Sequence, residues 1–445
     1  MNTRSLKLLI FSLPAIGLAL TGCSSGNNSG NPLASIQAAQ VKNSGNFATT
    51  VFLGDSLTAG YQSSSLLDTQ QVHGWAPLVA MQAGFNIIQP LIAYPGAPNV
   101  LQLVTVGPPP VIASAPGTTT GRNNFAIQVT DLAVPGAFVN DVANTVPLAN
   151  PIAGQQQINQ LVLGFPGLGY GQAYSQATFA IKAQPTTIFL WIGNNDALIA
   201  DLTGSPASMT SVANFTTQYQ TLMSELTTQT SAHLVIGNIP DVTQVPYLTP
   251  AAYILSLYSQ ATGIPAANIS ALLGIVPGDY VTPAGTAQIN AILHRTQRPP
   301  LTDAGVLTAA EVVTVQAQVT AFNQVIAATA AAATLVDINA LFAQVTKSGL
   351  TINGYTGTST FLGGFFSLDG IHPTNTGFAV VANTFIDTMN AAFKTSTADV
   401  VLGPIAAADP LWPPNLAHTA APAVIPATAG LAANKLLLPA RPPTP

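Results

Sequence analysis

The sequence predicts an α/β fold in which a mostly parallel, five-stranded sheet is covered by helices on both faces. Two observations support this prediction. Short runs of apolar and β-branched residues alternate with longer stretches of helical spacing, a pattern typical of parallel strands joined by helical crossovers. Hydrophobic residues make up 48% of the 445 residues and charged residues only 6%, so the chain can bury a large core.

The first half of the chain contains three strand regions. Residues 47–53 form a short apolar run that ends at a glycine, and residues 75–83 follow with apolar side chains at helical spacing. A second strand region covers 126–134, and a Pro-Gly pair ends it. The clearest strand is 186–192, which is apolar and bounded by proline and glycine. Such continuous apolar runs are expected for strands that are buried on both faces.

The second half continues the alternation. Residues 212–227 predict a helix, and 233–237 predict another buried strand. The helix predicted for 308–332 opens with Thr-Ala-Ala-Glu, the pattern of a capping box. A fifth strand, 334–338, and a last helix, 378–393, complete the order.

Three segments interrupt or follow this pattern. Residues 84–120 are rich in proline and glycine, and residues 247–300 combine helical pieces with several prolines. We interpret both as insertions in a domain that spans 47–403. Residues 404–445 are rich in proline and alanine, which predicts a tail that is extended against the domain or disordered.

The N-terminus predicts export. Arg4 and Lys7 precede the apolar stretch 8–20, which is too short to span a bilayer comfortably. The sequence Leu-Thr-Gly-Cys then ends at Cys23, the single cysteine, so no intramolecular disulfide can form. This arrangement resembles the lipobox of bacterial lipoproteins. An ordinary signal peptide with an incidental cysteine and an uncleaved anchor are the alternatives.

The lipobox resemblance implies that residues 1–22 are a signal peptide and that Cys23 is lipidated. Residues 23–46, rich in Ser, Asn and Gly, would then form a flexible tether. Ser24 after the cysteine implies, for a Gram-negative source, a protein of the cell envelope held at the outer membrane. Lys and Arg total 11 against 16 Asp and Glu, without a basic block, which argues against nucleic-acid partners.

Four short motifs carry candidate chemistry. Ser56, in Gly-Asp-Ser-Leu, follows the first predicted strand and is expected to precede a helix. It is a candidate nucleophile, and its alternative role is a helix N-cap. Asp369 lies three residues before His372 in Asp-Gly-Ile-His-Pro. The carboxylate can orient the imidazole as a base, whereas a structural loop histidine is the alternative.

The other two motifs offer donors for an oxyanion. Asn195, in Gly-Asn-Asn-Asp, follows the 186–192 strand, where a side-chain amide can donate into a cleft. Gly136, which ends Leu-Ala-Val-Pro-Gly, offers a backbone N–H. A plain Asn/Asp turn and a tight glycine turn are the respective alternatives.

Taken in order, these four motifs resemble the GDSL esterases and lipases, also called SGNH hydrolases, over roughly residues 47–393. The resemblance implies a flavodoxin-like three-layer α/β/α sandwich. It also implies that Ser56 is the nucleophile, that His372 is the base oriented by Asp369, and that Ser56, Gly136 and Asn195 form the oxyanion hole. Asp55 and Asp196 would hold the turns.

We therefore expect an anchored serine esterase that hydrolyses carboxylic acyl esters, small-molecule or lipid, through a covalent acyl-enzyme. No metal or organic cofactor is expected. The apolar insertions favour an acyl-binding cleft. A carbohydrate esterase that removes O-acetyl groups is one alternative, and a catalytically inert surface lipoprotein that serves as a binding module is another.

Overall fold

The computed structural model describes residues 46–107, 109–152, 154–416 and 423–437. The predicted signal peptide, Cys23 and nearly all of the predicted tether lie outside these residues. No helix within the described ranges is both long enough and apolar enough to cross a membrane.

The centre of the molecule is a four-stranded parallel sheet in the order β1-β4-β5-β9. Its strands are β1 (Thr50–Gly54), β4 (Thr187–Trp191), β5 (His233–Gly237) and β9 (Ala333–Val336). Every residue of β1 and β4 is buried, as expected for strands covered on both faces. The predicted α/β class with a parallel sheet is confirmed.

The second predicted strand region, 126–134, is not a regular strand. Phe52 of β1 donates its N–H to Thr130 O at 2.9 Å and accepts at its carbonyl from Leu132 N–H at 2.8 Å. The only bridge of this segment to β1 within the described residues is that of Asp131. The N–H groups of Thr130 and Asp131 both turn to the carbonyl of Ile88. The sheet therefore has four strands and an irregular fifth segment along its β1 edge.

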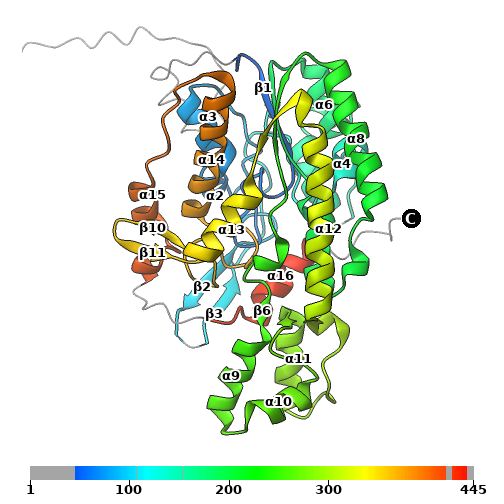
Figure 1. The fold of residues 1–445 in the computed structure, drawn as a ribbon. Helices are drawn as coiled ribbons and strands as arrows, with labels where there is room; N and C mark the ends of the chain where they lie inside the picture. Colours follow the sequence, from blue (N-terminus) through cyan, green and yellow to red (C-terminus); the bar gives the residue numbers. More distant parts are fainter. Residues whose placement is uncertain (1–45, 108, 153, 417–422, 438–445) are drawn as a thin grey trace, which may run out of the picture.

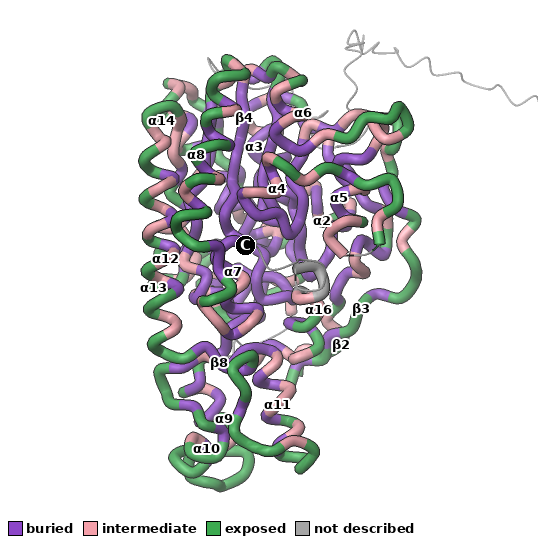
Figure 2. Tube along the Cα trace, turned by 90° about the vertical axis from the view of Figure 1, so that its right-hand side faces the viewer, coloured by how far each residue is buried: buried purple, intermediate pink, exposed green. Residues whose placement is uncertain are grey.

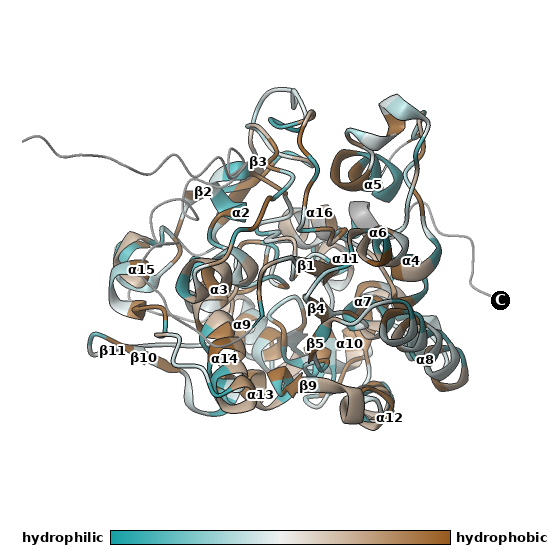
Figure 3. Cartoon of the chain, turned by 90° about the horizontal axis from the view of Figure 1, so that it is seen from above, coloured by the Kyte–Doolittle hydropathy of each residue, from teal (hydrophilic) through white to brown (hydrophobic). Residues whose placement is uncertain are grey.

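Helices cover both faces of the sheet. Seen from above, the row β1, β4, β5, β9 lies between α3 and α14 on one side and α6 and α8 on the other (Figure 3). The bounds of these and the other helices of the two outer layers are α2 (Asp68–Gln71), α3 (Trp75–Ala83), α4 (Val139–Asn144), α5 (Gln155–Leu163), α6 (Gln176–Ala183), α7 (Asn194–Thr203), α8 (Val212–Gln229), α12 (Ala309–Ala328), α13 (Ile338–Ser348) and α14 (Asn375–Phe393). The arrangement is the expected three-layer sandwich.

Aromatic side chains fix the helices to the sheet. Trp75 of α3 stacks on Phe385 of α14 with ring centroids 3.9 Å apart, and Phe215 of α8 stacks on Phe322 of α12 at 4.0 Å. The capping box predicted for α12 is present, because Thr308 and Glu311 exchange side-chain and backbone hydrogen bonds. The interior between the layers is continuously buried (Figure 2).

The two proline-containing segments form structures of their own. The first contains the hairpin β2 (Leu101–Thr105) and β3 (Val111–Ser114). The second forms a helical lobe beyond one end of the sheet (Figure 1) with a separate apolar core. Its elements are β6 (Thr249–Pro250), α9 (Ala251–Thr262), α10 (Ala266–Leu273), β7 (Tyr280–Val281), α11 (Pro283–Leu293) and β8 (Val306–Leu307).

The C-terminal region differs from the predicted extended or disordered tail. It forms α15 (Leu402–Ala408) and α16 (Ala427–Leu437), and α16 packs against α11 of the lobe. Asp409 accepts from the N–H and the hydroxyl of Thr376 at 2.8 and 2.7 Å, in the first turn of α14. Packing on α14, β10 and α11 explains the difference, and the high helix propensity of alanine between the prolines is compatible with it. A further hairpin, β10 (Leu350–Ile352) and β11 (Tyr355–Gly357), packs near α15.

Candidate active site

Ser56 lies in a turn directly after β1. Gly54 must be glycine, because a Cβ there would lie 2.5 Å from Trp191 O. The predicted helix after Ser56 is not formed. Instead, Ala59 N–H donates to Asp55 O at 3.1 Å and Tyr61 N–H donates to Ser56 O at 3.0 Å, which makes a series of turns. The turns present the Ser56 hydroxyl at the carboxyl end of the sheet, where open parallel sheets bind ligands.

The serine, the histidine and the aspartate form one continuous hydrogen-bonded chain. His372 Nε2 lies 2.8 Å from Ser56 Oγ, and His372 Nδ1 lies 2.9 Å from Asp369 Oδ2. All three side chains are buried. The Ser56 hydroxyl therefore contacts the imidazole rather than capping a helix. With Nδ1–H donating to the carboxylate, Nε2 is free to accept the serine proton.

Asp369 is held as a carboxylate by several donors. Besides His372 Nδ1, its Oδ2 accepts from Ser64 N–H at 2.7 Å, and its Oδ1 accepts from the N–H groups of Ile371 and His372 at 2.9 Å each. Burial alone would raise the pKa of Asp369. The charge of His372 and these hydrogen bonds outweigh burial and lower the pKa below its ordinary value. The group therefore stays ionised and can orient the imidazole.

Asn195 lines the same small cavity as Ser56, and its hydrogen bond to Ala137 holds the loop that follows Gly136 beside it. Asn195 lies in the first turn of α7, where the helix dipole favours negative charge. Its Nδ2 donates to Ala137 O at 2.8 Å, which leaves the second amide hydrogen available. Gly136 has φ +79°, a conformation that favours glycine. Within the described part of the chain, the backbone N–H groups of Ser56 and Gly136 donate no hydrogen bond.

Two aspartates hold these loops, as the resemblance implies. Asp196 accepts from Val139 N–H at 3.0 Å, which ties the segment after Gly136 to α7. Asp55 accepts from the Asn194 side chain at 2.9 Å. Burial raises the pKa of Asp55 to about 6, with the hydrogen bond from Asn194 opposing the increase.

The cavity beside the serine is small. It has a volume of about 30 Å³ and is lined by Ser56, His372 and Asn195 together with apolar side chains that include Leu198 and Phe342. Such a volume holds about two water molecules.

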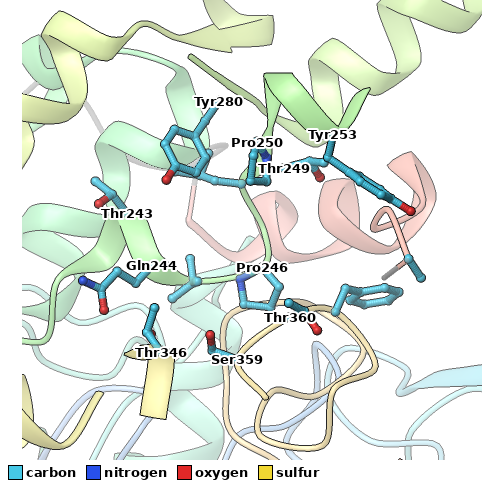
Figure 4. A pocket seen from close by; sticks show the side chains of 14 residues that line it. Thr243, Gln244, Pro246, Thr249, Pro250, Tyr253, Tyr280, Thr346, Ser359 and Thr360 are labelled. Atoms are coloured by element: carbon cyan, nitrogen blue, oxygen red, sulfur yellow. The ribbon is translucent and has the colours of Figure 1, made fainter. Parts of the chain in front are cut away.

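A larger pocket of about 330 Å³ shares part of its lining with the small cavity; Figure 4 shows the larger pocket from close by. Its walls come from the segment after β5, from the helical lobe, from α13, from the loop after β11 and from Ala423 of the C-terminal region. Val245 lines both cavities.

Sequence reasoning missed several neighbours of the site. The ring centroid of Tyr61 lies 4.8 Å from that of His372, and the Ser63 N–H donates to Ser367 Oγ at 2.9 Å. The run of three serines at 63–65 is the signal that could have indicated a buried polar loop. Phe342 carried no signal, because one apolar residue on a helix does not reveal which cavity it borders.

The other histidines lie outside this arrangement or outside the described residues. His233 begins β5 and is exposed, and His294 is exposed at the end of α11. Among the side chains that the structure describes, no group of three His, Cys, Asp or Glu residues could hold a metal ion. The structure brings together Ser56, Asp369, His372, Asn195 and the Gly136 loop, whereas Cys23 and His418 are not described.

Comparison with known proteins identifies the family to which the chain belongs. No curated protein matches the chain. The family described as GDSL-like Lipase/Acylhydrolase matches residues 50–385, which is most of the chain and includes every residue of the serine, histidine and aspartate arrangement. The chain therefore belongs to the GDSL-like lipase/acylhydrolase family.

Proposed function

We propose that this acylhydrolase cleaves carboxylic esters through a covalent acyl-enzyme on Ser56. The observation that carries the proposal is the chain of contacts Ser56 Oγ–His372 Nε2 at 2.8 Å and His372 Nδ1–Asp369 Oδ2 at 2.9 Å. A surface protein that served only as a binding module would gain nothing from holding a buried base in contact with a buried hydroxyl.

The geometry supports the following sequence of steps. Ser56 Oγ attacks the ester carbonyl carbon while His372 Nε2 takes the hydroxyl proton. The N–H groups of Ser56 and Gly136 and the free amide hydrogen of Asn195 stabilise the oxyanion. When the intermediate collapses, the alkoxide leaves with the proton from His372. Water then attacks the acyl-enzyme with the same base, and the carboxylic acid is released.

The size of the cavity beside Ser56 favours a short acyl group, as in O-acetyl esters, over the long chains of a lipase substrate. A long chain would require Leu198, Phe342 and their neighbours to move out of a volume of about 30 Å³. The apolar lining fits an alkyl group of this size.

The test is a panel of 4-nitrophenyl esters from acetyl to palmitoyl, assayed with the wild-type protein and with Ser56→Ala. We expect activity to be highest with the acetyl ester and to be absent in the variant. Activity that persists in Ser56→Ala would overturn the mechanism. A maximum at palmitoyl would overturn the assignment of a short acyl group and leave the mechanism standing.

We also propose that Cys23 is the lipidated first residue of the mature protein, which would hold it at the outer membrane of the cell envelope. The basic residues, the apolar stretch 8–20 and the motif that ends at Cys23 support this proposal. Mass spectrometry of the native N-terminal peptide tests it. Lipid on Cys23 is expected, and an unmodified Cys23 would contradict the anchor.

A further inference from the structure

The larger pocket adjoins the catalytic cavity through two separate elements. On the segment after β5, Val242 lines the small cavity, Thr243 lines the larger pocket and Val245 lines both. On α13, Phe342 lines the small cavity and Thr346, four residues later, lines the larger pocket. Four residues of helix span about 6 Å along its axis. The two spaces are therefore neighbours, and Val245 is part of the lining of both.

Backbone contacts fix this shared lining to the catalytic loop. Tyr247 N–H donates to Gly370 O at 2.9 Å, between Asp369 and His372. Gly370 has φ +71°, and a Cβ there would lie 2.9 Å from Tyr247 N. The Tyr247 hydroxyl donates to Asn434 of α16 at 2.7 Å. The position of the larger pocket relative to His372 is therefore set by the fold and not by a free surface loop.

The lining of the larger pocket is uncharged. Aromatic rings of Tyr253, Tyr280 and Phe361 supply apolar surface, and the remaining polar side chains that the structure describes there are threonine, serine and glutamine. Tyr253 and Tyr280 lie above the pocket in Figure 4, with the hydroxyl-bearing loop of residues 359–360 below. An ionic ligand would lose its hydration without gaining an opposite charge, so the lining selects for a neutral ligand.

The pocket also contains polar groups that have no partner. Gln244 donates through Nε2 to Asp241 Oδ2 at 3.1 Å, but its buried Oε1 accepts no hydrogen bond. The side chain of Thr249 is buried and has no hydrogen-bond partner among the described residues. A buried carbonyl oxygen without a donor is costly. Oε1 is covered in the empty pocket, so a ligand hydroxyl reaches it only when the Gln244 side chain turns toward the pocket. The resulting hydrogen bond would satisfy Oε1, whereas an alkyl chain could not.

We propose that this pocket binds the alcohol half of the ester and that this half is an uncharged polyol with an apolar face, such as a sugar ring or a glyceryl group. The volume of about 330 Å³ lies at the lower end of the range for small-molecule sites. The assignment rests on the proposed ester hydrolysis at Ser56, which supplies the acyl half. The insertion 247–300 and the C-terminal region then serve to recognise substrate.

The test compares three acetate esters by acid release: ethyl acetate, whose alcohol is too small to reach the pocket, an O-acetylated methyl glycoside, and glyceryl triacetate. The readout is the ratio of kcat/KM for each polyol ester to kcat/KM for ethyl acetate. The wild-type protein should give a ratio well above one for at least one polyol ester. The ester that does so identifies whether the alcohol half is a sugar or glycerol. Equal efficiency with all three esters would overturn the proposal.

Two variants with matched controls locate the effect. Thr346→Trp fills the pocket from α13, and we expect it to lower the polyol ratio at least tenfold. Gln344→Trp, also exposed on α13 but outside the pocket, should keep the wild-type ratio. An unchanged ratio in Thr346→Trp, or an equal fall in Gln344→Trp, would remove the pocket from the substrate path.

The second pair tests the unsatisfied acceptor. Gln244→Leu removes Oε1 and is expected to lower the polyol ratio about tenfold. It also removes a hydrogen bond to Asp241, so Gln316→Leu is the control, because Gln316 donates to Asp241 Oδ2 and to Thr243 Oγ1 at 3.0 Å each without itself lining the pocket. An equal fall in both variants would show that Gln244 acts through Asp241 and would contradict the proposal.

The failure of this inference and the failure of ester hydrolysis give different results. If Ser56→Ala keeps its activity on ethyl acetate, the mechanism at Ser56 is wrong and the alcohol assignment falls with it. If Ser56→Ala is inactive while Thr346→Trp and Gln244→Leu keep the wild-type ratios, the hydrolase stands and the pocket has no part in substrate binding.

Discussion

Asp369→Asn is the substitution that most directly tests how the site is built. Each carboxylate oxygen of Asp369 accepts from at least two donors: Oδ2 from His372 Nδ1 and Ser64 N–H, and Oδ1 from the N–H groups of Ile371 and His372 and, at 3.3 Å, from the Ser367 hydroxyl. An asparagine amide has only one acceptor oxygen. In either orientation, its NH₂ group would face two N–H donors across distances of 2.7 to 2.9 Å.

The two orientations predict two different defects. If the NH₂ group faces His372, the imidazole must present its unprotonated Nδ1 to it and carry the proton on Nε2. That tautomer cannot accept the Ser56 proton, and we expect kcat to fall about 10⁴-fold, or about 5 kcal/mol of barrier. If the NH₂ group faces the backbone instead, two hydrogen bonds to a charged acceptor are lost at about 1.5–3 kcal/mol each.

The assay is kcat for 4-nitrophenyl acetate, measured at substrate saturation with the folded fraction determined by denaturant titration. Asp409→Asn is the matched control, because Asp409 is also buried and accepts two hydrogen bonds at the start of a helix. Asp409→Asn should lose stability and keep kcat per folded molecule. If Asp369→Asn retains kcat within tenfold of the wild-type value, the orienting role assigned to Asp369 is wrong.

Three further outcomes are expected. Asn195→Ala should lower kcat by about 10² to 10³-fold with little change in KM, because an oxyanion donor acts mainly in the transition state, and a change confined to KM would contradict that role. Burial raises the pKa of Asp131 from 3.8 to about 7, so the folded state holds this proton more tightly. Ionisation of Asp131 therefore lowers the free energy of unfolding as pH rises from about 4 to 7, by up to about 4 kcal/mol. Denaturant titrations should show this decrease in the wild-type protein and not in Asp131→Asn, and parallel pH curves for the two proteins would refute it. Phe342→Ala should enlarge the cavity beside Ser56 and move the preferred acyl chain from acetyl toward butyryl or hexanoyl, at a cost of about 3–5 kcal/mol in stability. An unchanged chain-length profile would show that Phe342 does not limit the acyl group.

The larger pocket changes how the extra segments of this chain are interpreted. The lobe formed by residues 247–300 has its own apolar core, so it can present Tyr253 and Tyr280 without disturbing the central sheet. The helix α16 packs on this lobe and contacts Tyr247, whose backbone binds the catalytic loop. We therefore expect differences in substrate among related chains to arise from these segments rather than from the sheet.

Local patterns in the sequence determined the elements and the reactive groups. Continuous apolar runs identified β1, β4, β5 and β9 to within three residues, because a strand buried on both faces needs apolar side chains at nearly every position. The candidate nucleophile Ser56 and the oxyanion donor Asn195 follow the ends of β1 and β4 in short motifs, and parallel strands bring their carboxyl ends to one edge. Strands and short motifs of this kind depend on residues that are close together in the sequence, so the sequence alone can indicate them.

Tertiary contacts decided what the local patterns left open. The segment 126–134 has the composition of a strand, but two of its N–H groups bind Ile88 and limit it to one bridge. Residues 402–408 and 427–437 are helical because they pack on α14, β10 and α11, where the sequence predicted an extended tail. The larger pocket takes its walls from five separate segments. Composition and periodicity describe one segment at a time, whereas a pocket is the space that several segments leave between them.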